Sequence, residues 1–343
     1  MRRKSPPNDA QTRAPATHVI ILDGTLSSLE PLCQTTAART YTLLREMGAA
    51  VSLYYAPGLQ WDNWRSIRDV ATGKGINRQI KRAFGWLASR YRAGDRIFLF
   101  GYSRGAYAVR SLAGVIDRVG LLRSDHATQR NIKAAYRHYE CTPNSDAARS
   151  FARARCHPQV EIEMIGVWDT VKSLGFNAPV LWRLSERLHA FHNHDLSAIV
   201  KHGYHALAHD ETRAAFAPVM WECHDDYPGR LEQVWFPGAH GDVGGQLGGY
   251  EAARPLANIP LDWMLGRAAD CGLPLPEGWE TRHPKVPLAP ALGTGRGHGR
   301  FLMTRKRRKI GGYVSERVHE SVSARRDTSV ENALAVPAGT RNF

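Results

Sequence analysis

A serine flanked by glycines ends a short hydrophobic run, and this arrangement can supply a nucleophile. Residues 96–100 are mainly aromatic and aliphatic and predict a buried strand, whereas residues 106–116 read as a helix. Between them lies Gly101-Tyr102-Ser103-Arg104-Gly105, and the order strand, Gly-x-Ser-x-Gly, helix is typical of a nucleophile elbow. Glycine on either side of the strained serine avoids a clash in so tight a turn. We interpret Ser103 as a hydrolase nucleophile; the alternative is an ordinary glycine-rich turn.

Such a serine also needs a base, an acid that orients the base, and donors for the oxyanion. Polar residues of the required types follow predicted strands at several places in the chain. Because the carboxyl ends of the strands in a doubly wound sheet open into one crevice, these residues can meet Ser103. In chain order they are Asp23, Gly24, Asp169, His240, Asp242 and His319.

Two triads fit the order serine, acid, histidine that α/β-hydrolases follow. We prefer Ser103–Asp242–His319, because it takes the acid and the histidine from the positions that are commoner in that fold. In this interpretation His240 is structural and Asp169 supports a neighbouring loop. The alternative triad, Ser103–Asp169–His240, stays open.

The chemistry would be that of a serine hydrolase. The histidine accepts the proton of Ser103 during attack on an ester carbonyl and later donates it to the leaving alcohol. We expect the backbone N–H groups of Gly24 and Arg104 to form the oxyanion hole, with Asp23 shaping the first of these loops.

The elements that must position these residues alternate between strand and helix, which predicts an α/β fold with a doubly wound, mostly parallel sheet of α/β-hydrolase type. A helical insertion, or cap, is expected at about residues 172–225, between two strands. The predicted strands are 18–22, 51–55, 96–100, 160–167, 231–236 and one near 310–318; the predicted helices are 35–47, 76–91 and 106–116. The Pro- and Gly-rich segment 279–300 reads as a loop.

We expect one catalytic domain over residues 18–325, between a disordered leader (1–17) and a flexible tail (326–343). The chain has no apolar run of transmembrane length and no Sec signal, which favours the cytoplasm, or non-Sec export of an effector. The five cysteines are scattered, as in a reducing compartment.

The chain is basic, with 46 Lys and Arg against 32 Asp and Glu and a net charge of +14. An anionic membrane surface is one partner that such a charge can attract. The densest run, residues 305–309, is interpreted as a solvated loop. Nucleic acid is not expected, because no recognised nucleic-acid module is present.

Histidines cluster in two places, but neither group has a fixed ligand motif. We expect structural or surface roles for them, no metal site and no cofactor; a divalent ion near His240 and Asp242 stays open. The two groups are His189, His192, His194 and Asp195, and His202, His205 and His209.

Six segments together resemble an α/β-hydrolase family that includes the phospholipase effectors of type VI secretion. These segments are residues 21–25, 100–116, 166–175, 205–218, 234–245 and 318–322. The resemblance implies lipolytic serine-hydrolase chemistry on glycerophospholipid or related esters, with Ser103, Asp242 and His319 carried over as the triad. The chain has Leu26-Ser27 where the family has Trp-Asn, and Gln246 where a third glycine is expected.

The leading hypothesis is therefore a serine lipase or phospholipase, acting as an antibacterial effector with an ester or phospholipid substrate. The alternatives are a housekeeping esterase for small molecules and a catalytically silent hydrolase fold that binds anionic membranes. The sequence identifies no immunity or delivery partner.

Overall fold

The computed structural model describes residues 13–58, 74–171, 196–222, 227–295 and 304–326. Most of the expected leader and tail, and residues 172–195 of the expected helical insertion, lie outside the described residues, as does the histidine group at 189–195.

Within the described chain, seven strands form one all-parallel sheet in the order β2-β1-β3-β4-β5-β6-β7. The expected α/β fold is thereby confirmed. The chain leaves β1 toward β2 and then returns past β1 to β3, so the winding direction changes between β1 and β3. The strands are β1 (Thr17–Leu22), β2 (Val51–Ala56), β3 (Arg96–Tyr102), β4 (Ile162–Trp168), β5 (Val200–Ala208), β6 (Arg230–Phe236) and β7 (Glu316–Val318).

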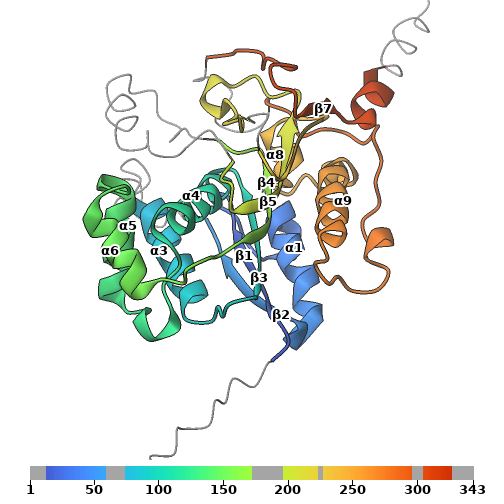
Figure 1. Ribbon diagram of the computed structural model, residues 1–343. Coiled ribbons are helices and arrows are strands. Elements are labelled where there is room, and N and C mark those ends of the chain that lie inside the picture. The colour runs from blue at the N-terminus through green and yellow to red at the C-terminus, as the bar shows by residue number, and fades with distance from the viewer. Residues whose placement is uncertain (1–12, 59–73, 172–195, 223–226, 296–303, 327–343) are drawn as a thin grey trace, which may run out of the picture.

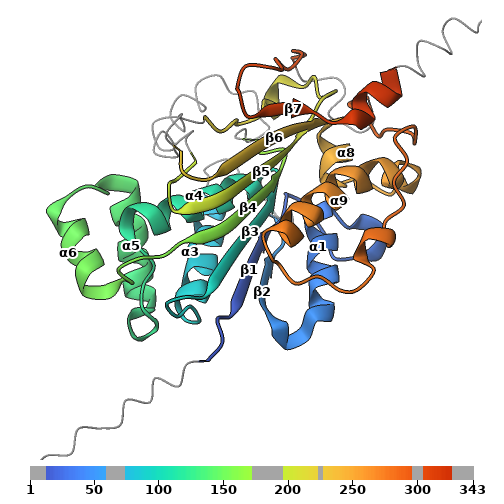
Figure 2. The same cartoon turned by 45° about the vertical axis from the view of Figure 1, so that its right-hand side comes forward.

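Helices cover both faces of the sheet, as Figures 1 and 2 show. On one face lie α3 (Lys74–Ala88), α4 (Arg104–Val119), α5 (Gln129–Cys141) and α6 (Asp146–Arg155). On the other lie α1 (Thr36–Leu44), the short α8 (His240–Gly244) and α9 (Arg254–Asp270). Short 3-10 helices occur at Pro31–Cys33, Arg45–Ala50, Ser124–His126, Ala214–Phe216, Glu251–Ala253 and Trp279–Thr281.

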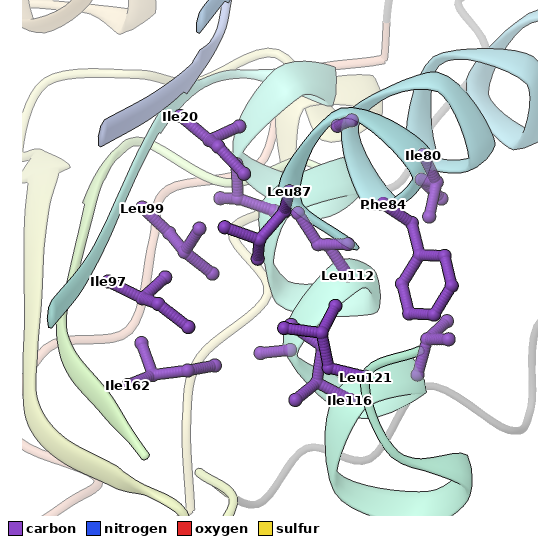
Figure 3. Packing of buried hydrophobic residues seen from close by; sticks show 14 of the residues in the cluster. Ile20, Ile80, Phe84, Leu87, Ile97, Leu99, Leu112, Ile116, Leu121 and Ile162 are labelled. Atoms are coloured by element: carbon purple, nitrogen blue, oxygen red, sulfur yellow. The ribbon is translucent and has the colours of Figure 1, made fainter. Parts of the chain in front are cut away.

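The alternation of side chains along the strands divides the core into two layers. In β1, Ile20 packs against α3 and α4, whereas Val19 and Ile21 belong to the layer under α1 and α9. Figure 3 shows the first layer, with strand residues such as Ile20 and Leu99 facing Leu87 of α3. Because helices cover both faces, every residue of β1 is buried, as a central parallel strand requires.

One strand was not predicted. β5 lies inside the range that we assigned to a helical insertion, yet it pairs with β4 on one side and β6 on the other. Its histidines break the apolar run that marks the other strands. His205 is nevertheless completely buried, because its Nε2 accepts the backbone N–H of Thr170 and its Nδ1 contacts the amide oxygen of Gln233. Hydrogen bonds thus make a polar residue acceptable in a central strand.

Candidate active site

Ser103 occupies the sharp turn between β3 and α4. Its backbone has φ 58° and ψ −119°, a conformation that L-residues rarely adopt. A Cβ atom on Gly105 would lie 2.0 Å from the carbonyl oxygen of Leu22, and one on Gly101 would lie 2.6 Å from that of Gly105. Gly105 therefore lets the turn pack against the end of β1, and Gly101 lets the end of β3 pack against the start of α4.

A chain of two hydrogen bonds leads from Ser103 into the protein. His240 Nε2 lies 2.9 Å from Ser103 Oγ, and His240 Nδ1 lies 2.6 Å from Asp169 Oδ2. An ionised carboxylate can only accept, so Nδ1 carries the proton and Nε2 accepts the hydroxyl proton of Ser103. All three residues are buried. This is the geometry that a serine nucleophile, a general base and an orienting acid require.

The three residues come from three different strand ends. Asp169 follows β4 directly, and His240 is the first residue of α8, which follows β6. α8 folds back across the sheet onto β3, since a Cβ atom on Gly244 would lie 1.9 Å from the ring of Tyr102. This fold-back carries His240 past β5 and β4 to Ser103.

Aromatic rings hold the imidazole of His240 in place. Tyr102 stacks on it with ring centroids 4.9 Å apart, and Phe216 packs against it at 4.7 Å. The backbone N–H of His240 donates to Glu211 Oε2. Tyr102, Glu211 and Phe216 were not identified from the sequence as site residues, because nothing in their spacing separates them from ordinary core and loop positions.

Asp169 is ionised despite its burial. Burial raises the pKa of a carboxyl group, but the Arg308 guanidinium and the hydrogen bond to His240 hold the pKa of Asp169 well below its usual range. Arg308 belongs to the basic run that we interpreted as a solvated loop. Its side chain is instead almost completely buried, with 4% exposure, against the carboxylate.

The structure places Asp242 and His319 elsewhere. The carboxylate of Asp242 accepts backbone N–H groups from Ala239, Leu292 and Gly293, so it stabilises the start of α8 and fastens a distant loop to it. His319 Nδ1 lies 2.8 Å from Ser321 Oγ, and its ring stacks on Phe236.

The structure therefore joins the members of the alternative triad rather than those of the preferred one. His319 follows the edge strand β7, four strand positions from β3, which corresponds to about 19 Å. Without a fold-back of the kind that α8 makes, a histidine at that edge is too far from Ser103.

Both expected oxyanion donors lie beside Ser103. Arg104 is the first residue of α4, where a backbone N–H has no acceptor within its own helix. A Cβ atom on Gly24 would lie 3.4 Å from the Cβ of Ser103, so this loop is in direct contact with the nucleophile. The N–H of Gly24 donates to Asp23 Oδ1 at 2.6 Å. Burial lowers the pKa of the half-buried Arg104 side chain to about 10.

Asp23 shapes the loop that carries Gly24, as expected. Its Oδ2 accepts the hydroxyl groups of Thr35 and Tyr55, and burial raises its pKa to about 6. Gln246 adds a second connection, because its amide nitrogen donates to the carbonyl oxygen of Thr25 at 2.8 Å. The residue that replaces a family glycine thus links α8 to the loop after β1.

The second histidine group is dispersed. His205 is buried behind Asp169, and burial lowers its pKa to about 3. His202 lies 4.0 Å from Glu163, and His209 contacts Asp210. Among the described residues, no three His, Cys, Asp or Glu side chains are grouped as metal ligands. No helix in those residues has the length and apolarity needed to cross a membrane.

Comparison with known proteins adds to this geometry. An uncharacterized protein of Saccharomyces cerevisiae is 28% identical over an alignment of 225 residues, and the match covers 58% of this chain and 31% of that protein. The chain thus matches less than a third of this relative's length.

Two solved structures are similar over part of the chain. An uncharacterized protein from Pseudomonas aeruginosa has a TM-score of 0.48 at 16% identity and covers 81% of this chain and 48% of its own. A Tle1 effector bound to the VgrG spike of the type VI secretion system has a TM-score of 0.32 at 17% identity, covering 71% and 55%.

A family model matches residues 17–267, about three quarters of the chain, and therefore includes β1, the elbow and α8. Its description is the catalytic domain of Tle1-like phospholipase effectors of type VI secretion. The resemblance inferred from the six sequence segments is confirmed, and the chain belongs to the Tle1-like phospholipase effector family through this catalytic domain.

Proposed function

We propose that the protein is a serine hydrolase of carboxylic esters in which Ser103, His240 and Asp169 form the catalytic triad. The observation that carries this proposal is the pair of hydrogen bonds from Ser103 Oγ through His240 to Asp169, at 2.9 and 2.6 Å. The preferred members from the sequence, Asp242 and His319, are assigned structural roles in this proposal.

His240 Nε2 accepts the hydroxyl proton as Ser103 Oγ attacks the ester carbonyl, and Asp169 stabilises the resulting imidazolium. The oxyanion that forms is held by the N–H of Arg104. The N–H of Gly24 becomes the second donor only when it leaves Asp23 Oδ1, its acceptor in this structure. The imidazolium then donates its proton to the leaving alcohol. Water repeats the sequence on the acyl-enzyme and releases the acid.

The family suggests phospholipase activity, and we propose phospholipid esters as the substrate class. The net charge of +14 supports action at an anionic membrane surface. A role as an antibacterial effector of type VI secretion, exported without a Sec signal, rests on the family assignment.

Labelling by a fluorophosphonate probe, combined with a panel of phospholipid vesicles and soluble esters, tests the proposal. We expect wild-type protein to be labelled, Ser103→Ala to be unlabelled, and His240→Ala to lose at least about 10³-fold in turnover. His319→Ala is the control, because it removes a half-buried imidazole outside the proposed triad and should keep activity within a few-fold.

An active His240→Ala variant together with an inactive His319→Ala variant would favour the triad Ser103–Asp242–His319 instead. Folded wild-type protein that is neither labelled nor active would refute the hydrolase and favour a silent fold. Turnover of short soluble esters alone would favour the small-molecule esterase.

A further inference from the structure

Arg308 differs from every other member of the basic run at residues 305–309. Its side chain is 4% exposed, whereas the other four residues of the run are exposed. Burying a guanidinium is costly unless the group is paired and its N–H donors are satisfied. The loop therefore turns one of five consecutive cations inward.

The Arg308 guanidinium donates hydrogen bonds to both carboxylate oxygens of Asp169. Nη1 donates to Oδ1 at 2.6 Å and Nη2 to Oδ2 at 2.9 Å, which is the bidentate arrangement that only arginine provides. The same two nitrogens donate to the carbonyl oxygens of Ala208 and Phe216, at 2.8 and 2.5 Å. Arg308 thus joins the carboxylate to the end of β5 and to the loop whose Phe216 ring packs on His240.

These contacts fix the orientation of the Asp169 carboxylate. Oδ1 accepts from Arg308 and from the backbone N–H of Ala208, and Oδ2 accepts from Arg308 and His240. Rotation of the carboxylate would break several charge-assisted hydrogen bonds at once. Oδ2 is therefore held where it meets His240 Nδ1.

We propose that Arg308 is a positioning residue of the catalytic triad, which holds Asp169 in register with His240 and sets the pH range over which His240 acts as a base. This inference rests on the proposed hydrolase function. It concerns a residue outside residues 17–267, the part of the chain that the family model matches.

The pH effect follows from the charges around the imidazole. Glu211 and Arg213 form their own ion pair at 2.6 Å, so their charges largely cancel. The titratable and charged groups that face the Asp169–His240 pair are Tyr102 on β3, Asp23 after β1, His205 on β5, Glu211 and Arg213 after β5, and Arg308 itself. Without Arg308, Asp169 becomes an uncompensated negative charge beside the imidazole, which favours the imidazolium. The neutral, catalytically competent imidazole then appears only at higher pH.

The test uses the full chain and a water-soluble ester, with kcat/KM measured as a function of pH. Arg308→Ala is compared with Arg307→Ala, a matched control that removes the same charge from the adjacent, exposed position. We expect Arg308→Ala to lose about 10²-fold in kcat, because the acid is no longer positioned. The acid limb of its profile of kcat/KM against pH should move up by about one pH unit. Added guanidinium ion should restore part of the activity. Arg307→Ala should match the wild type in all three measurements.

Two results would overturn the inference. In the first, Arg308→Ala matches Arg307→Ala in kcat and in pH profile. In the second, kcat falls but the acid limb stays in place and guanidinium restores nothing, as expected for a purely structural arginine.

Arg308→Lys covers the case in which the alanine variant does not fold. It keeps the charge but loses the fork, so we expect a wild-type acid limb with reduced kcat, and an unchanged kcat would refute the positioning role. Fluorophosphonate labelling of the wild type separates the two proposals. Absence of labelling removes the hydrolase function and this inference with it, whereas labelled, active wild type with normal Arg308 variants removes this inference alone.

Discussion

Backbone strain in the described chain gathers around the nucleophile. The residues other than glycine with positive φ in that part of the chain are Leu26, Ser103 and Asp169, at 60°, 58° and 42°. They follow β1, β3 and β4, three strands that are neighbours in the sheet. Strain of this kind persists only where the surroundings enforce it, and it concentrates at functional sites. Both ends of the proposed hydrogen-bond relay are therefore strained.

Exchange of the acid for its amide tests the relay at the level of single atoms. In Asp169→Asn the amide can present N–H to His240 Nδ1, which favours the wrong imidazole tautomer, and we expect kcat to fall by about 10³- to 10⁴-fold. Asp242→Asn is the matched control. It weakens the backbone contacts at Leu292 and Gly293, so it should lower the free energy of unfolding measured in urea. Its kcat should fall far less than that of Asp169→Asn. The reverse ranking of the two variants in kcat would contradict the assignment of Asp169.

Asp23 gives the protein a pH-dependent stability with a defined sign. Its pKa is about 6 in the folded state against 3.8 in the unfolded chain, so between these values the folded state binds the additional proton. The free energy of unfolding should therefore fall as pH rises from about 4 to about 7, by about 3 kcal/mol from this residue. Urea unfolding at several pH values measures it, and Asp23→Asn should lack this component. An equal slope in the variant would exclude Asp23 as its source.

At the scale of secondary-structure elements, α8 determines which histidine reaches Ser103. Gly244 makes this approach possible, because any Cβ there would overlap the ring of Tyr102. Gly244→Ala should push α8 away from β3, cost about 1–3 kcal/mol of stability, and lower kcat by moving His240. Thermal unfolding and ester turnover measure the two effects.

Gly266→Ala is the control for this variant. Gly266 lies inside α9, and a Cβ atom there would meet only Trp279, at 3.9 Å. The control variant should leave turnover unchanged and raise stability by up to about 1 kcal/mol, since alanine favours the helix. Loss of activity in both glycine variants would indicate that α8 packing is not the cause.

The elements that sequence patterns predicted are those whose hydrophobic pattern is regular. Strands β1, β2, β3 and β4 and helix α4 carry apolar runs or helical spacing that survive without tertiary information. β5 was missed because its histidines are acceptable only through partners such as Gln233, 28 residues away in sequence. Sequence patterns also did not show which histidine lies beside Ser103, since the fold-back of α8 is a tertiary contact. Arg308 could not be separated from its basic neighbours by sequence alone.

At the scale of the whole molecule, the net charge of +14 predicts salt-dependent binding to anionic lipid surfaces. Ser103→Ala should bind vesicles that contain anionic lipid and should bind far more weakly to neutral vesicles. Because exposed charges are screened by salt, binding should fall as ionic strength rises. Vesicle co-sedimentation at several salt concentrations measures this dependence. Equal binding to neutral and anionic vesicles, insensitive to salt, would show that charge does not drive the contact.

The order in which the chain is synthesised gives the Asp169–Arg308 pair a further consequence. Ser103, Asp169 and His240 all leave the ribosome well before Arg308 does. A nascent chain that ends before residue 308 can close the relay from serine to histidine to aspartate, yet its buried carboxylate has no guanidinium beside it. Arg308 is thus the last of these four side chains to be synthesised, and it completes an electrostatic balance that the other three leave open.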